Sequence, residues 1–135
     1  PTRRSSDLIQ KYSMQDSCVI TSFDYSALQA VRSYDEEIEV GYILSVAYGK
    51  FYEIDDVDFF SVNASFLTKR VVDAIHNSGK QVYAWTVNND ASIKNLTNKG
   101  VDNIITDKPV TAREVIYSRD TSETLINMIK YVFNQ

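Results

Sequence analysis

The residue types that carry out acid–base and metal chemistry are scarce in this 135-residue chain. His76 is its one histidine and Cys18 its one cysteine. This excludes an intramolecular disulfide, zinc sites built from several cysteines and mechanisms that need two histidines. His76 falls in the last turn of an expected helix, where a cation suits the helix dipole, so we expect a surface role for it. Cys18 is expected to pack in a strand.

Two carboxylates, Asp24 and Asp107, stand where β-rich runs end and helices are expected to begin. An aspartate in such a position usually caps the helix by accepting hydrogen bonds from its first amides. A catalytic pair is the alternative, but no neighbouring group would orient a nucleophile beside them. We therefore expect both carboxylates to cap helices.

Trp85, the only tryptophan, lies near the end of another β-rich run. Its indole could fill the core, or it could form the aromatic wall of a ligand pocket while its N–H donates a hydrogen bond. Asn88, just beyond it, is either a turn residue or a polar contact for a ligand. The residues alone leave both alternatives open. The four glycines lie too far apart to form a phosphate-binding loop.

Five short, β-rich runs recur about every 20 residues and would position these side chains. Such runs are typical of parallel strands that are buried on both faces. Helical patterns separate most of them, with Asp90 as the expected cap of one helix, whereas residues 45–57 have a loop-like pattern. The expected strands are 17–23, 39–44, 58–63, 81–87 and 103–107, and the expected helices are 7–12, 24–34, 68–78, 91–99 and 110–117.

Strands and helices that alternate at near-constant spacing predict a parallel α/β sheet with right-handed crossovers. Even spacing favours the wall of a barrel over a doubly wound sheet, and a complete TIM (β/α) barrel needs about 250 residues. The sequence therefore predicts a partial TIM barrel of about five βα units. Residues 1–6 are expected to form a polar leader that starts inside a longer protein. Residues 7–117 would hold the βα units, and 118–135 an amphipathic C-terminal helix.

Charge and hydropathy exclude two further classes of protein. The net charge of −4 argues against a nucleic-acid binder, which normally presents a basic face. No apolar run approaches the roughly 20 residues that a membrane-spanning helix needs.

Two linked motifs give the chain a family resemblance. Residues 82–88 (Val-Tyr-Ala-Trp-Thr-Val-Asn) and 100–109 (Gly-Val-Asp-Asn-Ile-Ile-Thr-Asp-Lys-Pro) together resemble the C-terminal signature of the glycerophosphodiester phosphodiesterases. Upstream, residues 19–24, 40–44 and 76–80 resemble other parts of the same family. The resemblance covers residues 7–117.

The resemblance implies a TIM barrel of the phospholipase-C-like type, with the five strands here similar to its fourth to eighth. Members of the family hydrolyse glycerophosphodiesters to an alcohol and glycerol 3-phosphate with a divalent cation, often calcium or magnesium. Their metal-binding acids and two histidines come from the first three strands, and those motifs are absent here. The resemblance therefore implies the C-terminal portion of such an enzyme. The longer parent enzyme would bind the cation, and this portion alone would hold no catalytic residue and no metal ligand.

By the same resemblance, Phe23 and Trp85 would line the glycerol side of the substrate pocket, together with Asn63 and Asn88. The expected ligand of the parent is a small glycerophosphodiester, and no nucleic acid is expected. A barrel this incomplete would leave two sheet edges without neighbours. We therefore expect the chain to form a homo-oligomer or to pair through its edges.

Two other interpretations stay open. The chain could be a non-enzymatic half-barrel that oligomerises, or one that binds a phosphoester without cleaving it. It could also be an unrelated doubly wound domain, but that fold needs a ligand crevice where the strand order reverses, and the sequence has no loop motif for one.

Overall fold

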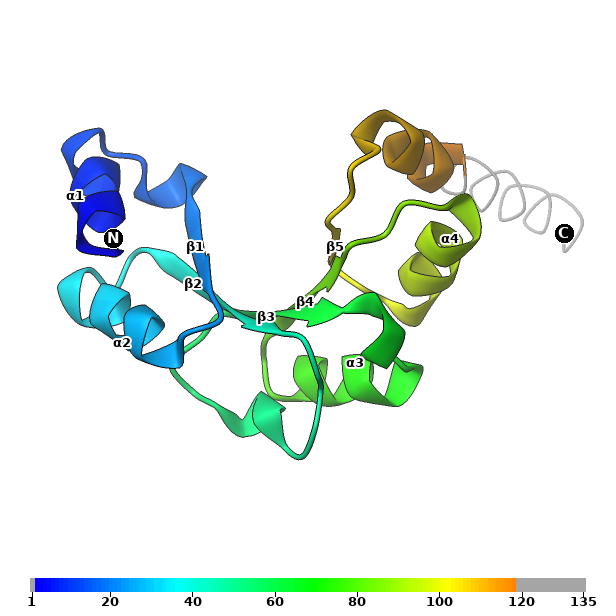
Figure 1. Ribbon diagram of the computed structural model, residues 1–135, viewed down its shortest axis with the longest axis horizontal. Coiled ribbons are helices and arrows are strands. Elements are labelled where there is room, and N and C mark those ends of the chain that lie inside the picture. Colours follow the sequence, from blue (N-terminus) through cyan, green and yellow to red (C-terminus); the bar gives the residue numbers. More distant parts are fainter. Residues whose placement is uncertain (1, 119–135) are drawn as a thin grey trace, which may run out of the picture.

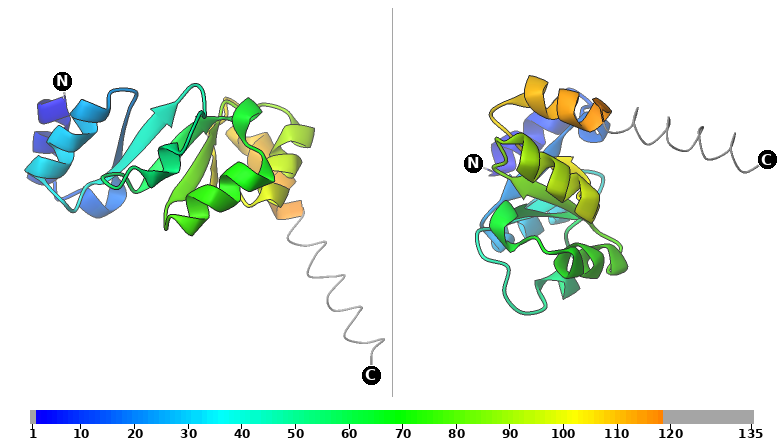
Figure 2. Two further views of the ribbon diagram at one scale, coloured as in Figure 1. Left: turned by 90° about the horizontal axis from the view of Figure 1, so that it is seen from below. Right: turned by 90° about the vertical axis from the view of Figure 1, so that its right-hand side faces the viewer.

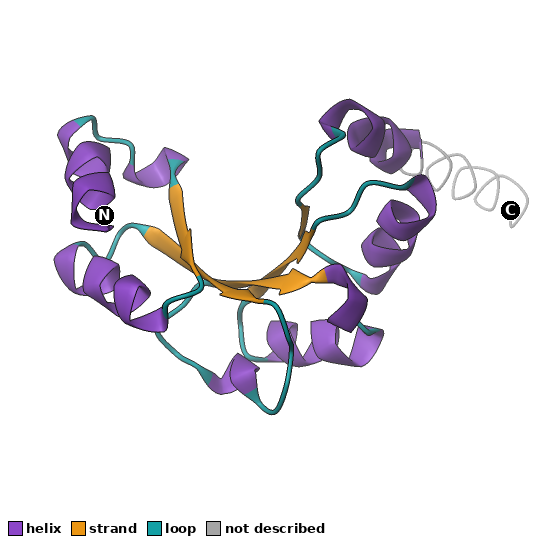
Figure 3. Cartoon of the chain, in the orientation of Figure 1, coloured by secondary structure: helices purple, strands orange, loops and turns teal. Residues whose placement is uncertain are grey.

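The computed structural model describes residues 2–118. Its centre is one sheet of five parallel strands in the order β1-β2-β3-β4-β5, which follows the order of the chain (Figure 1). The sheet curves into an open trough, and the helices within residues 2–118 lie on its convex side (Figure 3). The strands are β1 (Val19–Ser22), β2 (Glu39–Leu44), β3 (Phe59–Asn63), β4 (Gln81–Trp85) and β5 (Asn103–Ile104).

α-Helices follow most of these strands and cover the convex face of the sheet (Figure 2, left). Between β2 and β3 there is only the short 3-10 turn Phe51–Glu53, in agreement with the loop expected at residues 45–57. The expected α/β architecture with five parallel strands is thereby confirmed. No helix within residues 2–118 is both long and apolar enough to cross a membrane. The helices are α1 (Thr2–Lys11), α2 (Tyr25–Tyr34), α3 (Lys69–Asn77), α4 (Asp90–Lys99) and a last one at residues 109–118.

The structure differs from the expectations at the ends of several helices and strands. Helix α1 starts at Thr2, so residues 2–6 of the expected polar leader are part of this helix. Asn89 caps α4, because its side chain accepts a hydrogen bond from the Ser92 amide, and Asp90 becomes the first helical residue. The strands β1, β4 and β5 are shorter than expected, and Cys18 lies directly before β1 rather than in it. The amphipathic helix expected within residues 118–135 lies outside the described residues, except at its first position.

The core lies between the convex face of the sheet and the helices. Alternate strand residues point to opposite faces. In β3, Phe60 and Val62 belong to the buried cluster, together with residues of α2, α3 and α4. Each such side chain contributes roughly 1.5–3 kcal/mol when it is fully buried. The strand positions on the other face are therefore left to line the trough.

Aromatic side chains lie at the centre of the concave face of the sheet. Phe59 is fully buried and stacks on Tyr83, with ring centroids 4.1 Å apart. A Cβ atom at Gly41 would lie 2.1 Å from the Phe59 ring, so only glycine lets this ring lie across β2. The rims are more open: Val19 at β1 is 46% exposed, and Ile105 beyond β5 is 43% exposed.

Candidate functional site at the carboxyl ends of the strands

The carboxyl ends of the parallel strands form the candidate functional site. Parallel α/β barrels bind ligands at this end, where the loops that follow the strands meet. All four residues expected to line a substrate pocket lie there. Phe23 follows β1, Asn63 ends β3, Trp85 ends β4 and Asn88 lies in the loop after β4.

Phe23 and Trp85 come into contact. Their ring centroids are 6.1 Å apart and their planes are nearly perpendicular, at 88°, which is the edge-to-face arrangement that aromatic pairs favour. Two strands separate β1 from β4 in the sheet, so the curvature of the trough brings the rings together. Phe23 is 61% exposed. The indole N–H of Trp85 donates to the Ser61 carbonyl at 3.0 Å, a partner that the sequence does not reveal, because every residue type has a backbone carbonyl.

Asn63 lies beside Trp85, since the two residues are partners in the pairing of β3 with β4. Its side-chain oxygen accepts from the Ser65 amide at 3.1 Å and from the Ser65 hydroxyl at 2.7 Å. These bonds cap the short turn Ala64–Phe66. The carbonyl of Asn63 is therefore engaged within its own turn.

Asn88 joins the loops that follow β4 and β5. Its Oδ1 accepts from the Thr106 hydroxyl at 3.0 Å and from the Asp107 amide at 2.9 Å, and its Nδ2 donates to Asp107 Oδ2 at 2.7 Å. The Val87 amide donates to the Ile105 carbonyl at 2.9 Å in the same place. Asn88 is thus engaged chiefly with the protein itself, and the role of Thr106 was not predicted from the sequence.

Asp24 caps α2, as expected. Its Oδ1 accepts from the Ser26 amide at 2.9 Å and from the Ser26 hydroxyl at 2.7 Å. The hydrogen bond from the Ser26 hydroxyl, followed by the one from its amide, lowers the pKa of Asp24 below the ordinary 3.8. An exposed carboxylate held ionised in this way serves the helix and is poorly suited to proton transfer.

The expectation that Asp107 caps the last helix is wrong. Its carboxylate accepts from the Asn88 side chain, and the Lys108 amide donates instead to Thr106 Oγ1 at 3.0 Å. The physical reason is that Asn88 offers a well-placed amide donor from the neighbouring loop. Asp24 and Asp107 share no hydrogen bond and do not form a pair.

His76 lies away from this site, at the amino ends of the strands. Its Nε2 is 2.9 Å from Asp102 Oδ2, and the same oxygen accepts from the Val82 amide at 2.8 Å. The imidazole is 36% exposed, which fits the expected surface role. Cys18 is a partly buried free thiol directly before β1.

The side chains of the site do not fit a divalent cation. Nowhere in residues 2–118 do three His, Cys, Asp or Glu side chains gather closely enough to hold one. The site instead offers aromatic surface, amide groups and hydroxyl groups. Such groups can shape a pocket and orient a polar ligand, but they supply no activated nucleophile.

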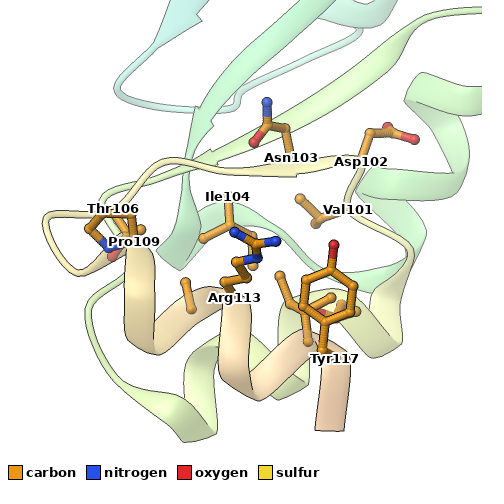
Figure 4. Close-up of a pocket in the computed structure, with 11 residues that line it drawn as sticks. Val101, Asp102, Asn103, Ile104, Thr106, Pro109, Arg113 and Tyr117 are labelled. Atoms are coloured by element: carbon orange, nitrogen blue, oxygen red, sulfur yellow. The ribbon is translucent and has the colours of Figure 1, made fainter. Parts of the chain in front are cut away.

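A separate hollow of about 460 Å³ lies on the outer side of β5 (Figure 4). It opens between β5, the end of α4 and the last helix, where Arg113 lies over the Tyr117 ring at 5.3 Å from the centroid. Its apolar surface comes mainly from Val101, Ile104, Pro109, Ala112 and Ile116. In a complete barrel a further βα unit would pack on this side of the last strand.

Comparison with known proteins identifies the family. The sequence profile of the Glycerophosphoryl diester phosphodiesterase family matches residues 2–111. The glycerophosphodiester phosphodiesterase of Caldanaerobacter subterraneus subsp. tengcongensis is 22% identical over 125 residues, which are 90% of this chain and 46% of the relative. That of Bacillus altitudinis is 25% identical over 112 residues, 79% of this chain and 46% of the relative. The chain therefore spans less than half the length of these relatives.

Solved structures agree on the fold. A phosphodiesterase from Oleispira antarctica, in complex with the product sn-glycerol-3-phosphate, matches with a TM-score of 0.76 and 27% identity over 85% of this chain and 48% of that protein. A glycerophosphodiester phosphodiesterase from Parabacteroides distasonis matches with a TM-score of 0.79 and 19% identity over 88% of this chain and 51% of that protein. The partial TIM barrel is thus confirmed, and the chain belongs to the glycerophosphoryl diester phosphodiesterase family.

Proposed function

We propose that the chain is the C-terminal portion of a longer glycerophosphodiester phosphodiesterase, the parent enzyme. The parent would hydrolyse glycerophosphodiesters to an alcohol and glycerol 3-phosphate. The observation that carries this proposal is the family match over residues 2–111 in a chain that spans only 44–46% of its curated relatives. The chain thus has the family's sequence but only part of a barrel to hold the active site.

Phe23 and Trp85 line the glycerol side of the substrate pocket in this proposal. Their edge-to-face contact builds an apolar wall at the strand ends, and an aromatic surface suits the carbon-bound hydrogens of a glycerol backbone. Asn63 and Asn88 lie at the rim of the same pocket. Their side-chain oxygens are engaged within the protein, so these residues shape the rim rather than accept hydrogen bonds from the substrate.

The reacting groups belong to the rest of the parent. Phosphodiester hydrolysis of this kind uses a cation to stabilise the phosphate charge and general acid–base groups to move protons. The described residues offer no cluster of cation-binding side chains. The one histidine is occupied at the opposite end of the strands. We therefore expect calcium or magnesium to bind only in the parent, and this chain alone to be inactive.

The test measures release of glycerol 3-phosphate from glycerophosphocholine, with calcium or magnesium, by the purified chain and by the parent expressed from its whole gene. Activity is expected in the parent alone. Phe23→Ala and Trp85→Ala in the parent should raise KM. Tyr12→Ala is the control and should leave KM unchanged, because this exposed residue precedes β1 and so belongs to the amino ends of the strands, away from the pocket. Turnover by the isolated chain would contradict the proposal.

A second candidate function rests on the open edges of the sheet. The exposed Val19 and Ile105 at the rims favour a half-barrel that pairs with other copies, or that binds a phosphoester without cleaving it. A parent without phosphodiesterase activity that still binds glycerol 3-phosphate would favour this non-enzymatic module over the enzyme.

A further inference from the structure

Asn88 is the centre of a compact hydrogen-bonded group at the carboxyl ends of β4 and β5. We call Asn88, Thr106 and Asp107 the Asn88 clamp. Three hydrogen bonds of 2.7–3.0 Å join the Asn88 side chain to the other two residues. A fourth bond, from the Lys108 amide to Thr106 Oγ1 at 3.0 Å, ties the clamp to the start of the last helix.

The clamp uses most of the bonding capacity of Asn88. An asparagine carbonyl has two lone pairs and its amide group has two N–H donors. Both lone pairs are taken, by the Thr106 hydroxyl and the Asp107 amide, and one donor is taken by the Asp107 carboxylate. Only one N–H is left for any ligand. Asn88 is therefore better suited to hold two loops together than to bind a substrate.

The clamp lies where strand pairing stops. The ladder between β4 and β5 ends with Ala84 and Ile104, directly before Trp85. Beyond it, two backbone hydrogen bonds and the clamp hold the loops together. The indole of Trp85 is fixed on its other side by the Ser61 carbonyl. Loss of the clamp would leave the loop directly after Trp85 held by the two backbone hydrogen bonds alone, so the position of the indole would be less fixed although its bond to Ser61 could still form.

We propose that Asn88 is a positioning residue that holds Trp85 against Phe23, and that its clamp thereby shapes the glycerol side of the pocket. The link to a pocket rests on the function proposed above, whereas the effect on Trp85 does not. The clamp acts through the loop backbone: Asn88 secures the loop after β4 to the loop after β5, and the fixed backbone sets where the indole can lie.

The sole tryptophan makes the proposal testable on the chain itself, since all tryptophan emission comes from Trp85. Asn88→Ala should shift the emission to longer wavelength and raise its quenching by acrylamide. The matched control is Asn89→Ala, which removes the α4 cap through Ser92 but leaves the clamp intact. It should lower the melting temperature without moving the emission.

A charge swap separates the clamp from a general loss of structure. Asn88→Asp places two carboxylates against each other and should shift the emission as Asn88→Ala does. Adding Asp107→Asn restores a donor, because the new amide at position 107 can donate to the new carboxylate at position 88. The double variant should recover the emission of the original chain. Original emission in Asn88→Ala, or the same shift in Asn89→Ala, would overturn the proposal.

In the active parent, Asn88→Ala should raise KM for glycerophosphocholine more than it lowers kcat. If KM is unchanged but the emission shifts, Asn88 positions Trp85, but this positioning does not contribute to substrate binding. An inactive parent would instead reject the proposed function, and the fluorescence result would still decide the role of the clamp.

Discussion

Asp24 shows how a single exposed side chain links pH to stability. Hydrogen bonds from Ser26 lower its pKa in the folded chain below the ordinary 3.8. A group with a depressed folded-state pKa stabilises the fold fully above its unfolded pKa, and this contribution is lost as the pH falls through the folded pKa. The cap should therefore contribute at neutral pH and stop contributing in acid.

We predict that Asp24→Ala lowers the melting temperature at neutral pH, and that its difference from the original chain shrinks as the pH falls below 3.8. Asp24→Asn keeps an oxygen acceptor for the Ser26 amide, so it should retain much of the cap at neutral pH. Thermal unfolding followed by circular dichroism across this pH range makes the measurement. A constant difference between Asp24→Ala and the original chain at every pH would contradict the assigned role.

At the scale of elements, two aspartates make the same contact in different βα units. Asp58, directly before β3, accepts from the Val40 amide of β2 at 2.8 Å and forms an ion pair with Arg32 of α2. Asp102, before β5, accepts from the Val82 amide of β4 at 2.8 Å and lies beside His76 of α3. Each aspartate therefore ties the start of one strand to the neighbouring strand and to a helix.

Removal of either aspartate should loosen the helix that it holds. We predict that Asp58→Ala lowers the free energy of unfolding by about 1–3 kcal/mol, because it leaves the Val40 amide without its carboxylate partner. Asp55→Ala is the matched control and should change little, since this nearby carboxylate makes no hydrogen bond or ion pair with the described part of the chain. Urea denaturation measures both variants. Equal effects would show that the Asp58 contacts contribute nothing specific.

The elements also show which features sequence patterns can predict. β2 has the expected bounds, and the Asp24 cap was predictable because its partner lies two residues away. The Asn88–Asp107 contact spans 19 residues, and no spacing rule connects those positions. Helix α1 was missed before Asp7, because its first residues are polar and show no apolar periodicity, although Ser6 is only 1% exposed. Local capping can be predicted from the chain, whereas contacts between loops depend on the fold.

At the scale of the molecule, the sheet of residues 2–118 is an open arc, and the strand at each rim, β1 or β5, pairs with a neighbour on one side only (Figure 3). All five strands are parallel, so β1 of one copy could pair in parallel with β5 of another about a twofold axis along the strands. Val19 and Ile105 lie at these rims and are 46% and 43% exposed. Such edges favour pairing when nothing else covers them.

We predict that the isolated chain self-associates, with a mass that rises with concentration in analytical ultracentrifugation. Val19→Lys combined with Ile105→Lys should shift the chain toward monomer, because lysines at a strand edge oppose pairing. The control is Tyr48→Lys, which removes an 89% exposed side chain from a loop and should leave the mass unchanged. An original chain that stays monomeric at every concentration would contradict edge pairing.

In a parent with a closed barrel both rims are covered, so the lysines should instead lower its melting temperature. If the lysines make the isolated chain monomeric but destabilise the parent, then the chain associates through the same sheet edges that the rest of the parent covers.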